Sequence, residues 1–328
     1  MKIKAVTVTG REQAALTTIA HDKPLGPNDV LGRTLVSLVS PGTELNWNYL
    51  GTQFPTHPGY ACVFRVDKVG AGVKQVKAGD TVFAMGGHRS VQQCDAGNVV
   101  VVPKGLKPEE AVIARLMGVT MATLKTAVAR PGDMVIVAGA GPVGYLGAHL
   151  FAKAGYDVRV VEPDAGRRAL VKKSGIATVY PAIPFDDPAV KGKVALVVEC
   201  SGHEQAVLDA CKIVRKRGEV VMVGVPWKRR TDLYAFDLLH AVFHQYTVLR
   251  SGWEWEVPNQ STDFQPHSIF SGFRLALRWL AEGRIPVRGH ITRNDPRKAQ
   301  AVYQDLIHSR AKGLFQEFDW RLGRRSAR

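Results

Sequence analysis

The spacing of apolar and polar residues divides the chain into three regions. The first, from residue 1 to about residue 103, consists of short β-like segments separated by turns rich in Gly, Pro and Asp. The segments are KIKAVTVTG, LGRTLVSLV, ACVFRVDKVG, DTVFAMG and NVVVVPKG, and AGVKQVKAGD is a turn-rich connector. This region is therefore predicted to be all-β.

The pattern changes at Pro108. The segment PEEAVIARLMGVTMATLKTAVA is long, has helical spacing and carries acidic residues in its first turn. Strands and helices then alternate in the order DMVIVAG, PVGYLGAHLFAKAG, DVRVVEP, AGRRALVKKSG, VALVVECSG, HEQAVLDACKIVRKRG and EVVMVGVP. The strands are continuous Val-rich runs, which is typical of strands covered on both faces. Strand, helix and strand at this spacing predict right-handed βαβ units and a parallel sheet.

After about residue 250 the alternation loosens. The segments SGFRLALRWLAEGRI and PRKAQAVYQDLIHSR have helical spacing, and GLFQEFDW is typical of a closing strand. We therefore expect an α/β domain inserted between an N-terminal β domain and a C-terminal return to it. The expected boundaries are 1–118 for the first part, 119–250 for the inserted domain and 251–328 for the return.

Composition agrees with a folded chain of about two domains, because 45% of its 328 residues are apolar and 22% are charged. The N-terminal lysines are not followed by an apolar stretch, which argues against a secretory signal. The four cysteines, Cys62, Cys94, Cys200 and Cys211, form no CxxC pair and fit a reducing compartment. We expect a cytoplasmic protein with no membrane partner.

The net charge of +15 is the one unusual bulk property. The basic clusters are Arg215-Lys216-Arg217, Lys228-Arg229-Arg230 and the tail 321–328. Such charge can attract nucleic acid or a membrane surface, but charge alone gives only sequence-independent affinity. The clusters are scattered and no nucleic-acid-binding motif accompanies them, so we interpret them as an Arg-rich solvated surface. A nucleic-acid partner is not expected.

Residues 139–144, Gly-Ala-Gly-Pro-Val-Gly, match the pattern GxGxxG. The match follows an apolar strand and opens a helix, which is the context in which this pattern binds a dinucleotide. Gly139 permits the tight turn, Gly141 lets a pyrophosphate approach the backbone, and Gly144 lets helix and strand pack closely. The helix N-terminus offers N–H groups and a partial positive charge to the phosphates.

The next strand ends at Glu162, which is 18 residues after Gly144. A carboxylate there can accept hydrogen bonds from both adenosine ribose hydroxyls, so NAD is the expected cofactor. Arg167 and Arg168 follow closely and leave NADP open, because arginine can bind a 2′-phosphate. The ends of two later strands are expected to line the nicotinamide side. The candidate cofactor-binding residues are Gly139, Gly141, Pro142, Val143, Gly144, Glu162, Arg167, Ser201, Gly202, Gly224, Val225 and Ser251.

The order of these parts resembles the medium-chain dehydrogenase/reductase superfamily, the alcohol dehydrogenase-like proteins. The resemblance is carried by GVKQVKAGDTVFAM, PEEAVIARLMGVTMATLKTA, VIVAGAGPVG, VVECSG, GEVVMVGVP and PRKAQAVYQDL, and it covers nearly the whole chain. It implies an α/β fold in which a Rossmann doubly wound parallel sheet is inserted into a GroES-like β-barrel catalytic domain. It also implies a homodimer formed through an edge strand, for which HQYTVLRSG is the candidate.

The segment SPGTELNWNYLGTQFPTHPGYA, residues 40–61, is rich in turn formers and aromatic residues, and we predict a loop rather than a helix. Zinc-dependent members of the superfamily place ligands in this segment and in the later helix. Pro41, Tyr60 and Met117 stand where those relatives have cysteine, histidine and cysteine. The resemblance therefore points to a zinc-independent branch, and no zinc is expected. The turn Ser40–Glu44 also resembles that of bacteriochlorophyllide hydroxyethyl dehydrogenases.

Without a metal, the charge that develops on the substrate oxygen needs hydrogen-bond donors or a general acid and base. The candidates are Thr43, Glu44, His57, Tyr60 and His88. Thr43 stands where relatives keep a hydroxyl of the proton relay. Glu44 replaces an aspartate that mostly supports the site. His57 can equally be a loop histidine with no task, and for His88 a packed histidine with satisfied hydrogen bonds is the favoured interpretation.

Three functions remain open from the sequence. The first is a zinc-independent, NAD(P)-linked oxidoreductase acting on a secondary alcohol or ketone. The aromatic residues Trp47, Tyr49, Trp253 and Trp255 are more often explained by core or dimer packing, but a cluster this aromatic near a cleft suggests a bulky or ring-shaped small molecule. The second is an enoyl or quinone reductase that adds hydride to a C=C bond. The third is a non-catalytic nucleotide-binding sensor or basic interaction protein.

Overall fold

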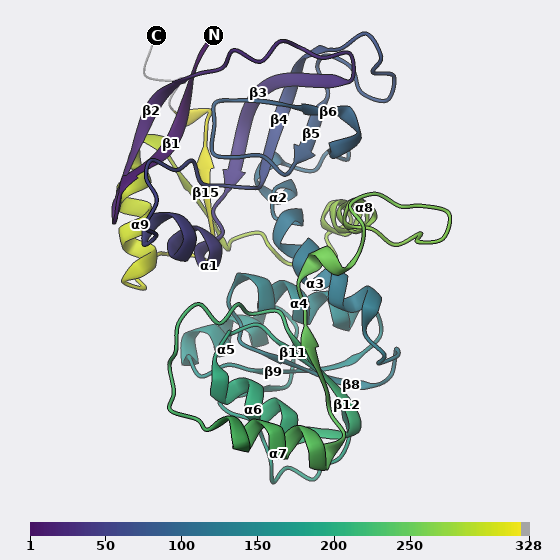
Figure 1. The fold of residues 1–328 in the computed structure, drawn as a ribbon. Coiled ribbons are helices and arrows are strands. Elements are labelled where there is room, and N and C mark those ends of the chain that lie inside the picture. Colours follow the sequence, from purple (N-terminus) through teal and green to yellow (C-terminus); the bar gives the residue numbers. More distant parts are fainter. Residues whose placement is uncertain (323–328) are drawn as a thin grey trace. The chain divides into compact units, whose positions relative to one another are not determined.

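The computed structural model describes residues 1–322, and the chain divides into two compact units (Figure 1). The first unit contains residues 1–115, 277–283 and the chain from 287 onward, and the second contains residues 116–276 and 284–286. Residues 251–276, which were expected in the return, therefore group with the second unit. The basic tail was noted in the sequence, but its arginines at 324, 325 and 328 lie outside the described residues.

The first unit is built on a seven-stranded sheet in the order β14-β15-β3-β4-β5-β7, with β6 paired to β3. The pairs of β3, β4, β5, β6 and β7 are antiparallel, and β14 runs parallel to β15. The strands are β3 (Asp29–Leu38), β4 (Cys62–Val69), β5 (Thr81–Ala84), β6 (Val91–Asp95), β7 (Val99–Val101), β14 (Ile291–Asn294) and β15 (Phe315–Asp319).

A separate hairpin of β1 (Lys2–Gly10) and β2 (Gln13–Ala20) completes the β structure of this unit. The C-terminal helix α9 (Ala299–Ile307) packs against β2, and β15 pairs with β3, so both ends of the chain meet in this unit (Figure 1). The remaining short elements are η2 (Ala96–Asn98), α2 (Pro108–Ala111) and η4 (Pro296–Lys298). One core cluster joins β1, α9 and β15, and in it Val6, Tyr49, Tyr303 and Phe318 are fully buried.

The expected loop at residues 40–49 is a helix, so that prediction was wrong. Pro41–Thr43 form α1 and Glu44–Tyr49 form a wide π-helical turn, η1. Proline is tolerated at the first position of a helix because its missing N–H has no intrahelical partner there. Tertiary contacts of Glu44 and Tyr49, which are both fully buried, override the weak local preference. Wide turns of this kind are frequent at functional sites.

The second unit is a doubly wound α/β domain with a six-stranded parallel sheet in the order β10-β9-β8-β11-β12-β13. Helix α3 (Ala114–Thr126) leads into it. The strands are β8 (Met134–Ala138), β9 (Asp157–Val161), β10 (Val179–Tyr180), β11 (Val194–Glu199), β12 (Val214–Met222) and β13 (Val248–Ser251). The helices are α4 (Pro142–Lys153), α5 (Ala165–Lys173), α6 (Glu204–Ile213), α7 (Ala235–Gln245), the short η3 (Glu254–Glu256) and α8 (Ile269–Ala281).

The central strands β8 and β11 are buried along their whole length, as their Val-rich sequences predict. The α/β fold class with a Rossmann-type parallel sheet is therefore confirmed. Two details differ from the sequence prediction. Helix α6 ends at Ile213 instead of continuing to residue 218, because β12 begins at Val214, which pairs with Val194 of β11. Helix α7 was not predicted at all.

Within residues 1–322, no helix is both long enough and apolar enough to cross a membrane. The apolar run from Met134 to Ala152 is explained as β8 followed by α4, as the sequence predicts.

Strand β15 contains an unusual buried carboxyl group. The Glu317 side chain is fully buried, and neither of its oxygens has a hydrogen-bond partner within the described part of the chain. Burial raises the pKa of Glu317 well above its ordinary value, and the nearby carboxylates of Glu109 and Asp319 raise it further. The folded state therefore favours the protonated form, and ionising this group costs stability.

We predict that Glu317→Gln makes the protein more stable at pH 8. Because the folded pKa is raised, the contribution of Glu317 is fully present below the unfolded pKa of about 4.3. It is lost as the pH rises through the folded pKa. Glutamine has the same shape and does not ionise, so the variant should gain about 1 kcal/mol or more over the wild type at pH 8. Urea unfolding at pH 5 and pH 8 measures this, with Glu12→Gln at an exposed position as the control. Equal or lower stability of the variant at pH 8 would contradict the prediction.

Candidate functional site

The glycine-rich turn lies between β8 and α4 of the second unit, where the sequence predicts a dinucleotide site. Gly139 has a φ of 93°, a left-handed conformation that favours glycine, and its N–H donates to the Val161 carbonyl at the end of β9. Helix α4 begins at Pro142 with Gly141 as its N-cap, so the helix N-terminus opens directly after the turn. This arrangement presents backbone N–H groups to an anion.

The other two positions of the turn favour glycine for different steric reasons. A Cβ atom on Gly144 would lie 1.9 Å from the Gly139 carbonyl oxygen, so a side chain cannot fit between helix and turn. A Cβ atom on Gly141 would meet no heavy atom within 4 Å. The space beside Gly141 is therefore open, and a ligand phosphate can approach the backbone there. Pro142 and Val143 form the first helical turn and are half-buried.

Glu162 lies immediately after β9 and is buried beside the glycine turn. Its carboxylate accepts hydrogen bonds from the Ala140 N–H at 2.7 Å and from the Asp164 N–H at 2.8 Å. The guanidinium of Arg167 is 3.9 Å from the same carboxylate and is half exposed. Arg168 instead donates to the backbone carbonyls of Glu162 and Pro163. One acidic and one accessible basic side chain thus flank the end of β9.

The carboxyl ends of β11 and β12 meet close to this turn. The Cys200 N–H donates to the Ala138 carbonyl of β8, and the Gly224 N–H donates to the Glu199 carbonyl of β11. A Cβ atom on Gly202 would lie 2.4 Å from the Val225 carbonyl oxygen, so the two strand ends are in close backbone contact. The structure therefore brings the predicted Ser201, Gly202, Gly224 and Val225 together at one end of the sheet.

A buried carboxylate supports this end of the sheet, and the sequence analysis did not identify it. Glu199 is fully buried and accepts hydrogen bonds from the N–H groups of Ser201 and Gly202 and from the Ser201 hydroxyl. Burial raises its pKa, and these hydrogen bonds oppose that shift. Glu199 holds the strand end in a tight turn.

Ser251 lies at the end of β13, opposite Met222 of β12, and its Oγ accepts a hydrogen bond from the Trp253 N–H. The neighbouring Arg250 binds the carboxylates of Glu219 at 2.6 Å and Glu256 at 2.8 Å. These two ion pairs engage the charge of Arg250 within the protein.

In the first unit, Glu44 and His88 form a fully buried hydrogen-bonded pair. The His88 Nε2 is 2.9 Å from Glu44 Oε2, and the Tyr303 hydroxyl donates to the same oxygen at 2.7 Å. The other carboxylate oxygen accepts from the Ser40 N–H at 2.7 Å. Burial raises the pKa of Tyr303 well above its ordinary value, and Glu44 adds to the shift. Glu44 thus has three donors and serves to hold this segment in place.

The opposite side of the His88 ring is also bonded. Its Nδ1 is 2.8 Å from Ser37 Oγ, which accepts a hydrogen bond from the Trp320 indole N–H. The ring also packs edge-on against Phe318. Since Ser37 accepts from Trp320, its own proton is available to His88 Nδ1, which leaves the proton of a neutral His88 on Nε2, facing Glu44. His88 is therefore a packed, fully bonded histidine in this structure.

Tyr60, Ser40 and Thr43 form a cluster of hydroxyl groups in the first unit. The Tyr60 hydroxyl donates a hydrogen bond to Ser40 Oγ and lies 3.5 Å from Thr43 Oγ1. Tyr60 and Thr43 are partly exposed, whereas Ser40 is buried. Of the predicted catalytic residues, the structure thus brings together Thr43 and Tyr60 in one group and Glu44 and His88 in another. Ser40 links the two groups through its backbone N–H and its hydroxyl.

His57 lies elsewhere in the first unit. It is exposed, and its Nδ1 is 3.1 Å from the Thr7 hydroxyl on β1, which also contacts Thr17 on β2. His57 is close to Tyr60 in the sequence, but the segment that contains His57 lies along β1, where Val8 and Thr56 exchange backbone hydrogen bonds. The hydrogen bond of His57 therefore goes to the hairpin and not to the hydroxyl cluster.

Arg115 is a residue of the first unit that the sequence analysis missed. It is the second residue of α3, only 4% exposed, and its guanidinium carbon lies 4.5 Å from the centre of the Tyr60 ring. A single charged residue in the apolar stretch AVIARLMG was the available signal. Charged residues are almost never this deeply buried unless they are paired.

The three positions that were compared with zinc ligands in the sequence hold none of the side chains that zinc sites ordinarily use. Within the described residues, no group of three or more His, Cys, Asp or Glu side chains is arranged to hold a metal ion. Pro41 begins α1, Tyr60 contacts Ser40, and Met117 is buried in α3. Zinc binds cysteine as thiolate, but burial raises the pKa of the four cysteine thiols, to about 12 for Cys94 and about 11 for Cys211.

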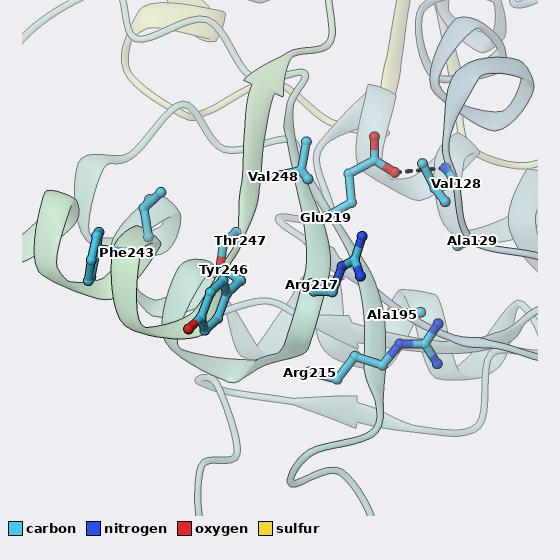
Figure 2. A pocket seen from close by; sticks show the side chains of 11 residues that line it. Val128, Ala129, Ala195, Arg215, Arg217, Glu219, Phe243, Tyr246, Thr247 and Val248 are labelled. Carbon is cyan, nitrogen blue, oxygen red and sulfur yellow. Dashed lines mark hydrogen bonds between the residues drawn. The ribbon is translucent and has the colours of Figure 1, made fainter.

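One further hollow of about 880 Å³ lies in the second unit (Figure 2). Phe243 and Tyr246 at the end of α7 face Arg215 and Arg217 of β12 across it, and Glu219 accepts a hydrogen bond from the Val128 N–H at its edge. Of its lining residues, Ala195, Arg215 and Val248 lie at the starts of their strands, whereas the glycine turn follows the last residue of β8. This hollow is therefore not the predicted cofactor site.

Comparison with known proteins agrees with these features. Residues 142–261 match the family "Zinc-binding dehydrogenase". The chain is 28% identical to L-threonine 3-dehydrogenase of Pyrococcus furiosus over 303 residues, which cover 77% of this chain and 85% of that protein.

Two solved structures show the same fold. Galactitol-1-phosphate dehydrogenase from Escherichia coli has a TM-score of 0.80 at 17% identity, covering 96% of this chain and 99% of that one. Acetophenone reductase from Geotrichum candidum, in complex with NAD, has a TM-score of 0.79 at 14% identity and covers 97% of each chain. The chain is thus an NAD(P)-dependent oxidoreductase, and over residues 142–261 it is similar to the zinc-binding dehydrogenases.

Proposed function

We propose that this protein is a zinc-independent dehydrogenase that transfers hydride between a nicotinamide cofactor and a secondary alcohol or ketone. The observation that carries the proposal is the pairing of a complete dinucleotide turn in the second unit with a cluster of hydroxyl groups in the first. The cofactor accepts or supplies hydride at its nicotinamide ring. The chain supplies the cofactor site and the groups that move the hydroxyl proton.

The second unit is proposed to bind the cofactor. The open space beside Gly141 and the N-terminus of α4 fit the pyrophosphate, and Glu162 fits the adenosine ribose. We propose NAD as the preferred form because the buried Glu162 carboxylate disfavours a 2′-phosphate. Arg167 keeps NADP as the alternative. The strand ends at Ser201, Gly202, Gly224, Val225 and Ser251 are proposed to line the nicotinamide side.

The first unit is proposed to move the proton. Tyr60 and Thr43 are partly exposed hydroxyl groups that contact one another, whereas Glu44 and His88 are fully buried and fully bonded. We therefore assign Tyr60 and Thr43 to proton transfer, and Glu44 and His88 to holding Ser40 and its neighbours in place. His57 is not part of this proposal, since its hydrogen bond goes to the β1–β2 hairpin.

Zinc independence is proposed on the chemistry of the side chains at the expected ligand positions. Proline has no ligating side chain, and the tyrosine and methionine there are not the ligands that zinc sites use. A contact between the partly exposed Tyr60 and the buried Arg115 occupies this part of the first unit instead. We also propose a cytoplasmic location, because the four cysteines are free.

Turnover with a substrate panel tests the proposed reaction. The purified protein with NADH should reduce bulky secondary ketones, and with NAD⁺ it should oxidise the matching alcohols, as followed by nicotinamide absorbance. Prior treatment with a chelator should leave the rate unchanged, and elemental analysis should find less than stoichiometric zinc. Turnover of enones but not ketones would instead support the C=C reductase alternative. Stoichiometric zinc whose removal abolishes activity would refute zinc independence.

Substitutions at two glycines of the turn should distinguish an effect on cofactor binding from an effect on stability. Gly141→Ala adds a methyl group to open space at a φ of −64°, so the fold should tolerate it while NADH binding weakens about tenfold or more. Gly144→Ala places a methyl group against a backbone carbonyl and should lower the free energy of unfolding by about 1–3 kcal/mol. Isothermal titration with NADH and thermal unfolding of both variants measure the difference. Unchanged NADH affinity of the Gly141 variant would argue against this cofactor pose.

A second copy of the chain is proposed to cover the face formed by α7 and β13. Phe236, Leu239 and Phe243 on α7 are 67–76% exposed, and Tyr246 and Val248 extend this apolar face to the edge strand β13. The outer edge of β13 has no paired strand within the described residues, so its backbone can extend the sheet into a partner. Large exposed apolar faces of this kind mark interfaces.

We predict a dimer in solution that a charge on α7 disrupts. Phe243→Asp together with Leu239→Asp should give a monomer in analytical ultracentrifugation, because burying two carboxylates in the interface is costly. Phe264→Asp is the matched control, since Phe264 is 98% exposed and lies outside α7 and β13. A wild-type monomer at tens of micromolar, or a dimer that survives the double substitution, would contradict this interface.

A further inference from the structure

Helix α7 carries two histidines that the proposed function does not use. We propose that His240 and His244 form a two-histidine site for a divalent transition metal ion, such as Zn²⁺, Ni²⁺ or Cu²⁺, on the surface of this helix. The site lies outside the residues that we assign to the cofactor and to proton transfer. It therefore stands independently of the proposed function, and no step of that reaction uses it.

The spacing of the two histidines makes them neighbours on one face of the helix. His244 follows His240 by four residues, and residues at i and i+4 lie next to each other on a helix surface. The centres of the two rings are 4.2 Å apart, and the ring planes are inclined by 49°. Two nitrogen ligands of a tetrahedral zinc ion are about 3.3 Å apart, because each lies about 2.0–2.1 Å from the metal. Rings this close can therefore each direct one nitrogen at the same ion.

The two rings lie on the outer face of α7. The inner face of this helix packs on α6 and β12, with Ala241 buried and with Leu238 and Val242 against the core of the second unit. His240 and His244 are both exposed. Within residues 1–322, the contacts of the two imidazole rings are with other aromatic rings, and no hydrogen bond or ion pair engages their nitrogens. These nitrogens are therefore available to a metal ion.

The neighbours of the histidines on α7 favour such a site. The ring centre of Phe236 is 5.6 Å from that of His240, and Phe243 packs edge-on against His244 at 5.3 Å. Side chains that are already held by contacts lose less conformational entropy when they bind a ligand. Asp237 lies three residues before His240 and seven before His244, a spacing that belongs to the same face of the helix. Its negative charge favours a cation there.

The chemistry of the pair selects the class of metal. Imidazole nitrogen suits Zn²⁺, Ni²⁺ and Cu²⁺, whereas Mg²⁺ and Ca²⁺ favour oxygen ligands. Two ligands on one helix bind more tightly than one, because the second bond forms within the same molecule. Within the described residues, no group of three or more His, Cys, Asp or Glu side chains is arranged around a metal position. The remaining coordination positions are therefore open to water, which makes this an exchangeable surface site rather than a closed structural one.

Calorimetric titration with Ni²⁺ tests the site and does not depend on turnover. The protein is used without an affinity tag and after treatment with EDTA, which is then removed. His240→Ala and His244→Ala should each weaken Ni²⁺ binding about tenfold or more, because the remaining imidazole has lost its neighbouring ligand. Ni²⁺ should also raise the unfolding temperature of the wild type, since a ligand that binds the folded state stabilises it. Either substitution should abolish this rise.

Two control variants distinguish this pair from histidines in general, of which the chain has ten. His267→Ala removes an exposed histidine outside α7 and should leave the Ni²⁺ affinity unchanged. Leu239→His together with His240→Leu exchanges two exposed neighbours and keeps the composition of the chain. This exchange puts the two histidines five residues apart, on different sides of the helix. It should therefore bind Ni²⁺ as weakly as the alanine variants.

Equal Ni²⁺ affinity of the wild type and the alanine variants overturns the inference, as does full affinity in the variant with exchanged residues. The substituted side chains are exposed, so the variants should fold, and thermal unfolding without metal checks this. Either alanine variant alone is sufficient for the test. Removing the surface ion should leave turnover unchanged. Loss of turnover on chelation would refute zinc independence, but it would leave a Ni²⁺ affinity that depends on His240 and His244 untouched.

Discussion

The arrangement of the first unit depends on the hydrogen bonds that one buried carboxylate, that of Glu44, accepts. Glu44 is fully buried, and an ionised carboxylate at such a position is tolerated only when strong donors surround it. The donors are the Ser40 N–H, the His88 ring and the Tyr303 hydroxyl, which come from three distant parts of the chain. The hydrogen bonds of Glu44 therefore connect the segment after β3 to helix α9, and they fix the backbone from which the side chains of Ser40 and Thr43 extend.

A steric constraint has the same function in the second unit. The carbonyl oxygen of Gly139 occupies the position that a side chain on residue 144 would need. Helix α4 can therefore lie this close to the turn only with glycine at residue 144. The result is a helix N-terminus beside open space at Gly141, with the Glu162 carboxylate bonded to the turn itself. The same turn therefore serves the packing of α4 and leaves the open space in which the cofactor phosphates are proposed to bind.

Several buried charges of the two units order segments of the candidate site. Glu199 orders the end of β11, Glu44 orders the segment after β3, and Arg115 lies on the Tyr60 ring. Glu317 differs from these, because its burial raises its pKa and no hydrogen bond compensates within the described residues. Most of the ion pairs that arginine forms in the described part of the chain are partly exposed, and such pairs contribute little to stability.

The sequence by itself determined the parallel sheet, the glycine turn and the acid that follows it, because each of these depends on residues close together in the chain. It also located Thr43 and Tyr60, although only through a resemblance. Tertiary structure decided the rest. It made a helix of residues 41–49, where local preference favoured a loop, because burying Glu44 and Tyr49 outweighs weak propensity. It also brought Arg115 onto Tyr60 across 55 residues of chain, a contact that no local spacing encodes.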